Sequence, residues 1–135
     1  MPRIDDYLGK VLERRASDLH FLAGDPPRIR VYGELTPLEP EPLAADFVKE
    51  TLYEIMPKAA LQRFEQHDGA DFAYTMADLG RFRVNVMRHL NGMGAVMRSI
   101  PSKALSMDDL KLPEAVRQLS RAANGLILVT GKTGS

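Results

Sequence analysis

Residues 81–100 read RFRVNVMRHLNGMGAVMRSI, and this stretch decides the fold of the chain. On either side of Asn91-Gly92, apolar and polar residues alternate, as they do in strands that bury one face. Asn-Gly is also the favoured pair for a two-residue hairpin loop. The stretch therefore predicts a hairpin of two antiparallel strands, and with it an antiparallel sheet.

The predicted hairpin separates its side chains into two faces. If Asn91-Gly92 sets the register, facing positions have a constant sum, so Asn85 faces Arg98 and Arg83 faces Ile100. One face then carries three arginines, which are Arg81, Arg83 and Arg98. The other face carries the apolar residues Phe82, Val84, Val86 and Met97, which is typical of a sheet that packs against helices.

Three arginines on one side of a rigid hairpin have two interpretations. A planar guanidinium can hold two phosphate oxygens at once, so the group is a candidate site for a polyanion. Alternatively, the arginines are solvated side chains that discourage aggregation of the sheet. The hairpin sequence leaves both interpretations open.

The remainder of the chain alternates helical and extended patterns. Apolar residues at helical spacing predict helices over about residues 4–15, 47–56, 58–67 and 113–123. Pro57 suits the start of one helix, and Asp68-Gly69 ends the same helical region. Further strands are predicted around Leu19–Phe21, Ile29–Val31, Leu35–Leu38, Phe72–Met76 and Gly125–Thr130. The pattern predicts a mixed α/β (α+β) fold, with an antiparallel sheet and flanking helices.

Composition indicates an ordinary water-soluble protein. Of 135 residues, 44% are hydrophobic and 27% are charged, which is unlike a disordered chain. Eighteen basic residues balance eighteen acidic ones, so no overall charge favours nucleic acid. Cysteine is absent, which excludes disulfides. No apolar stretch approaches the ~18 residues of a membrane span, and we expect a cytoplasmic location.

The apolar stretch at residues 125–130 leads into Gly131-Lys132-Thr133-Gly134-Ser135. A buried strand followed by glycine is the start of a phosphate loop, which reads Gly, four residues, Gly-Lys and then Ser or Thr. These five residues match its first five positions, so Lys132 is a spacer and not the phosphate-neutralising lysine. A flexible tail is the alternative. We expect no ATP hydrolysis from residues 1–135 alone.

Two smaller groups of polar residues are further candidate sites. His67, Asp68 and Asp71 have the appearance of a metal cluster, but such a site needs further ligands and only His20 and His89 remain. We therefore predict no metal site. Asp18 and His20 are two apart on a strand and share a side, which fits an acid–base pair or a structural hydrogen bond.

Taken together, these motifs resemble the PilT/PilU family of type IV pilus retraction ATPases, part of the secretion ATPase superfamily. The resemblance lies in Ala16-Ser17-Asp18-Leu19-His20, the glycines and prolines at 24–33, residues 81–85, residues 92–101 and the terminal stretch. It implies a PAS-like N-terminal domain at 1–101, a linker and helix at 102–124, and the first strand and partial phosphate loop of a RecA-like domain at 125–135.

The resemblance also implies a function for a longer protein. It implies a homohexamer that hydrolyses ATP with Mg²⁺ to drive pilus retraction and twitching motility, while no cofactor is expected for these 135 residues alone. Its location would be cytoplasmic, peripheral to the inner membrane at the pilus base, with the pilus platform protein as partner and no nucleic acid. Arg83, Arg98 and Arg81 would contact the nucleotide phosphates, and Gly131 to Ser135 would begin the phosphate loop.

Two alternatives of other classes remain open at this stage. A stand-alone PAS-like module would use its sheet to hold a partner or small ligand. A small metal-dependent phosphohydrolase would depend on His67, Asp68 and Asp71, and would require metal-dependent activity from this chain.

Overall fold

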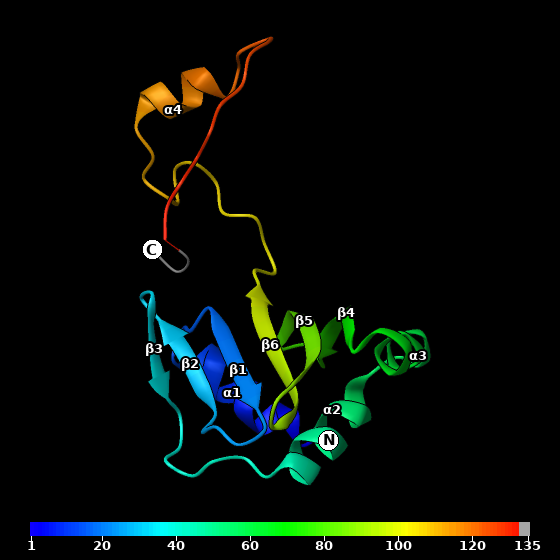
Figure 1. Ribbon diagram of the computed structural model, residues 1–135. Helices are drawn as coiled ribbons and strands as arrows, with labels where there is room; N and C mark the ends of the chain where they lie inside the picture. Colours follow the sequence, from blue (N-terminus) through cyan, green and yellow to red (C-terminus); the bar gives the residue numbers. More distant parts are fainter. Residues whose placement is uncertain (133–135) are drawn as a thin grey trace.

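The computed structural model describes residues 1–132, and in this part of the chain six strands form one antiparallel sheet with flanking helices (Figure 1). The strand order is β3-β2-β1-β6-β5-β4. The strands are β1 Asp18–Leu22, β2 Arg28–Val31, β3 Glu34–Pro37, β4 Gly69–Met76, β5 Gly80–His89 and β6 Gly92–Ile100. The predicted mixed α/β class is confirmed.

The helices are α1 Ile4–Glu13, α2 Ala45–Ile55, α3 Lys58–His67 and α4 Glu114–Leu119. Asp5 and Asp6 lie in the first turn of α1, where negative charge stabilises the helix dipole. Pro57 precedes α3, and Asp68 ends it in the left-handed conformation with φ 57°, as expected from Asp68-Gly69. No helix within residues 1–132 is long and apolar enough to cross a membrane.

One face of the sheet packs against α1, α2 and α3, and the core lies between them. Alternate residues of the central strands, such as Leu19, Phe21 and Phe82, are fully buried in one cluster with Leu8 and Leu52 of the helices. Each such side chain contributes about 1.5–3 kcal/mol through burial. The opposite face of the sheet, called the open face below, carries the intervening polar residues.

The hairpin forms with a register that differs from the prediction by two residues. His89 pairs with Gly92, so the loop is Leu90-Asn91, and Arg83 pairs with Arg98 instead of Ile100. An Asn-Gly loop of type I′ needs positive φ at both residues, whereas here only Gly92, at 130°, has one. A shift by two residues preserves the faces, because side chains alternate with a period of two. Arg81, Arg83 and Arg98 therefore share the open face as predicted.

After β6 the chain leaves the sheet. From Pro101 to Lys132 every residue is exposed except the half-buried Met107 and Arg117, and this segment extends beyond the end of β6 (Figure 1). The helix predicted at 113–123 is present but shorter, as α4. The strand predicted at Gly125–Thr130 does not form in the described part of the chain. A strand needs a hydrogen-bonded neighbour, and no described segment pairs with these residues.

Candidate functional site

The open face holds a line of charged side chains that crosses four neighbouring strands. Register places Arg30 of β2 opposite Asp18 of β1, Asp18 opposite Arg98 of β6, and Arg98 opposite Arg83 of β5. These four residues, Arg30, Asp18, Arg98 and Arg83, are called the arginine row. Three arginines and one aspartate give the row a net charge of +2 at neutral pH, so it favours an anion.

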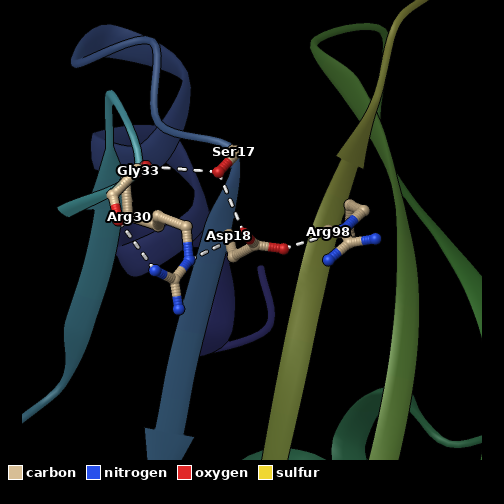
Figure 2. Close-up of polar contacts among 5 residues, drawn as sticks. All are labelled: Ser17, Asp18, Arg30, Gly33 and Arg98. Atoms are coloured by element: carbon tan, nitrogen blue, oxygen red, sulfur yellow. Dashed lines mark hydrogen bonds and ion pairs between the residues drawn. The ribbon is translucent and has the colours of Figure 1, made fainter. Parts of the chain in front are cut away.

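Asp18 lies at the centre of the row, and its side chain is only 1% exposed. Its Oδ1 accepts a hydrogen bond from Arg98 Nε at 2.9 Å, and its Oδ2 accepts one from Ser17 Oγ at 2.9 Å (Figure 2). Arg30 Nε lies 3.5 Å from Oδ2, while Arg30 Nη1 donates to the Gly33 carbonyl at 2.9 Å. The carboxylate is therefore held from both neighbouring strands.

The pKa of Asp18 reflects two opposed effects. Burial pushes this pKa upward because it disfavours the charged form. The hydrogen bonds from Arg98 and Ser17, with the charges of Arg98 and Arg30, outweigh burial and hold the pKa below its usual value. Asp18 is thus an ionised carboxylate at neutral pH.

Arg98 and Arg83 face each other across β6 and β5, and both side chains are well exposed, at 59% and 72%. Within residues 1–132, the ion pair of Arg83 is a single long contact, 3.9 Å from its Nη2 to Asp71 Oδ1. Beside them lies a hollow of 350 Å³, lined by Asp71, Arg83, Asn85, Val96 and Arg98. Like charges directly opposite each other destabilise a sheet unless an anion lies between them. Two planar guanidinium groups placed in this way can together hold an anion such as a phosphate group.

Arg81 is on the same face, one step further along β5, where it pairs with Ile100. It is exposed and lines a separate hollow near Ser102. Within residues 1–132 its side chain makes no ion pair or hydrogen bond. The structure thus brings Arg83 and Arg98 together and leaves Arg81 at the edge of the site.

The predicted phosphate-loop residues are only partly described. Gly131 and Lys132 are exposed and belong to no helix or strand. Thr133, Gly134 and Ser135 lie outside the described residues. The assignment of these five residues to a phosphate loop stays a prediction.

In the described part of the chain, members of the two smaller candidate groups make their hydrogen bonds and ion pairs with other residues and not with each other. Asp68 pairs with Arg88 at 2.6 Å, and Asp71 accepts a hydrogen bond from Asn85 at 3.1 Å. Across residues 1–132, no three His, Cys, Asp or Glu side chains are grouped closely enough to hold a metal ion. His20 shares the open face with Asp18, but the hydrogen bonds of Asp18 go to Ser17 and Arg98. Burial and the charge of Arg30 lower the pKa of His20.

Acid titration should reveal the contribution of Asp18 to stability. Because the folded-state pKa is depressed, this contribution is present above the ordinary value of about 3.9 and is lost as the pH falls through the folded-state pKa. In urea unfolding from pH 7 to pH 2.5, we expect the stability difference between the wild type and Asp18→Asn to shrink below about pH 4. A difference that stays constant over this range would contradict the depressed pKa.

Comparison with known proteins matches this sequence and this fold to one group of ATPases. No protein-family model matches the chain. The type IV pilus retraction ATPase PilT of Pseudomonas aeruginosa is 40% identical over 132 residues, covering 98% of this chain and 38% of PilT. The type IV pilus ATPase PilU of the same organism is 32% identical over 131 residues, covering 97% of this chain and 34% of PilU.

A solved structure gives the same result. The crystal structure of the pilus retraction motor PilT with bound ADP superposes with a TM-score of 0.73 at 34% identity, covering 96% of this chain and 38% of that one. The sheet and its flanking helices are therefore those of the N-terminal region of a secretion or retraction ATPase. By sequence and by fold, the chain is a homologue of the PilT/PilU-type ATPases and corresponds to that region. It spans less than two-fifths of the length of these relatives.

Proposed function

We propose that this chain is the N-terminal domain of a longer, hexameric cytoplasmic ATPase that powers type IV pilus retraction, and that Arg83 and Arg98 of its arginine row contact the phosphates of ATP. The observation that carries the proposal is the exposed Arg83–Arg98 pair on the open face of a chain that is 40% identical to PilT. The PilT structure with bound ADP supports a nucleotide as the ligand.

The row suits the chemistry of phosphoryl transfer. As ATP is hydrolysed, negative charge is spread over the γ-phosphate oxygens, and fixed guanidinium groups stabilise it. Arg98 and Arg83 can donate several N–H groups from two strands of a rigid sheet. Arg81 would add charge at the edge. ATP and Mg²⁺ would bind mainly in the motor domain of the longer protein, with the phosphate loop beginning at Gly131.

The mechanical step follows from the loss of this contact. When the γ-phosphate leaves, the arginines lose part of their binding partner, so the two domains can rotate apart. In a homohexamer, successive rotations would act on the pilus platform protein at the cytoplasmic side of the inner membrane. We propose no nucleic-acid partner, and we expect residues 1–135 alone to show no ATPase activity.

The coding sequence beyond the codon for Ser135 tests the proposal first. We expect Gly-Lys-Ser or Gly-Lys-Thr in frame, ATP turnover by the complete gene product, and loss of twitching motility on deletion of the gene. An immediate stop codon would reject the ATPase and favour the stand-alone PAS-like interaction module. A complete ATPase whose deletion leaves twitching unchanged would reject the retraction role alone.

A further inference from the structure

We propose that Asp18 is a positioning residue for Arg98, which it holds through Nε so that the two Nη groups are presented to the bound anion. The inference rests on the proposed contact between Arg98 and phosphate. It assigns a role to a carboxylate that itself repels the ligand.

Asp18 is buried although it lies outside the apolar core. Its side chain is 1% exposed although it lies on the open face, because arginines of the two neighbouring strands cover it. Burying a carboxylate is unfavourable unless it is paired and hydrogen-bonded. Both oxygens of Asp18 meet this condition, through Arg98 and Ser17. Both carboxylate oxygens of Asp18 therefore have hydrogen-bond partners before any ligand binds. Asp18 is thus a rigid support for Arg98.

The contact with Arg98 leaves most of the guanidinium available. A guanidinium has five N–H donors, and Asp18 accepts from Nε alone. Across residues 1–132, Arg98 makes no other side-chain hydrogen bond. The four Nη hydrogens therefore remain for an anion at the exposed side of the row. Fixing the guanidinium in advance lowers the entropy lost when the anion binds.

Arg30 has a different place in the row. It is 26% exposed, much less than Arg98, and its Nη1 is already used by the Gly33 carbonyl. Arg30 therefore contacts Asp18 from the side of β2, while Arg98 contacts it from the side of β6 (Figure 2). With Arg30 present, Asp18 keeps a second positive partner while the Nη groups of Arg98 bind the ligand.

Charge and positioning predict opposite results for Asp18→Asn. By charge alone, removing a carboxylate beside an anion site tightens anion binding. If Asp18 positions Arg98, the same substitution leaves Arg98 more mobile and weakens anion binding. A matched control is Asp25→Asn, which removes a carboxylate that also pairs with an arginine, Arg28, at 3.1 Å but lies outside the row. The sign of the change in affinity therefore distinguishes the two effects.

The test is a titration of the 135-residue chain with inorganic tripolyphosphate, followed through the NMR signals of the arginine Nε–H groups. We expect the Arg98 signal to shift, and Arg98→Ala to weaken binding about tenfold. Asp18→Asn should weaken it by about threefold or more, while Asp25→Asn leaves it unchanged or tighter. In the Arg98→Ala background, Asp18→Asn should add no further loss.

Arg98→Lys gives a second test that does not depend on altering Asp18. Lysine keeps the positive charge but cannot bind Asp18 with one nitrogen and the anion with two others, so it should bind as weakly as Arg98→Ala. Amide spectra of each variant report whether the fold is intact. Binding by Arg98→Lys at the wild-type level would overturn the positioning role.

Each remaining outcome separates the two proposals. If Arg98→Ala weakens binding but Asp18→Asn behaves like Asp25→Asn, the phosphate contact stands and the positioning role is overturned. If Arg98→Ala binds as well as the wild type, or the wild type does not bind, both are overturned.

Discussion

Replacing Arg83 or Arg98 with alanine in the complete protein should lower ATP turnover about tenfold or more, the scale of losing one group that stabilises charge on the transferred phosphate. The fold should persist, because both side chains are more than half exposed and neither contributes to the apolar core. Turnover is measured with Mg²⁺ and saturating ATP, and unfolding is followed in the same samples.

Arg88→Ala is the matched control for this experiment. Arg88 lies on the same strand as Arg83, but it is on the other face, where it pairs with Asp68 and lies over the ring of Phe64. The Arg88→Ala substitution should lower the free energy of unfolding and leave ATP turnover near the wild-type value. If Arg83→Ala and Arg98→Ala turn over ATP as fast as the Arg88→Ala variant, the arginine row has no part in the reaction.

The largest expected effect on stability comes from Phe21→Ala, which should lower the free energy of unfolding by about 3–5 kcal/mol. Phe21 is completely buried, and its ring contacts Tyr7 at 5.1 Å and Phe47 at 6.2 Å between centroids. It therefore joins the central strand β1 to α1 and α2. Urea unfolding at pH 7 measures the loss.

The comparison for Phe21 is Leu90→Ala in the hairpin loop. Leu90 is 98% exposed, so its removal should change the free energy of unfolding by no more than about 0.5 kcal/mol. A loss below about 1.5 kcal/mol for Phe21→Ala would mean that the core closes around the missing ring, contrary to the close packing described here.

Much of the fold follows from local pattern in the sequence. Helical spacing located α1, α2 and α3, and alternation located the strands of the sheet. The hairpin register was wrong by two residues, because the turn type depends on which residue takes a positive φ, and here that is Gly92 alone. The faces were nevertheless correct, since an even shift leaves each side chain on its own side.

The site was predictable only as far as it is local. The three arginines lie within one hairpin, so alternation together with a two-residue loop places them on one face. The contact of Asp18 with Arg98 joins residues 80 apart in the sequence, and no local pattern specifies which strand lies next to β1. The pairing of β1 with β6 brings Asp18 and Arg98 together. The stretch Gly125–Thr130 belongs to no strand within residues 1–132 for a related reason, since a strand pattern does not supply its neighbour.

The exit of the chain from the sheet coincides with the arginine row. Ser99 donates a backbone hydrogen bond to the Ser17 carbonyl at 3.0 Å, so the end of β6 is joined to the residue that precedes β1, directly beside Asp18. Pro101 follows two residues later, and from there to Lys132 every residue is exposed except the half-buried Met107 and Arg117. Arg98 is thus three residues from the start of this exposed segment. A pull on that segment therefore acts on the end of β6, where Ile100 pairs with Arg81 of β5 and Ser99 bonds to Ser17, next to the Arg98–Asp18 pair.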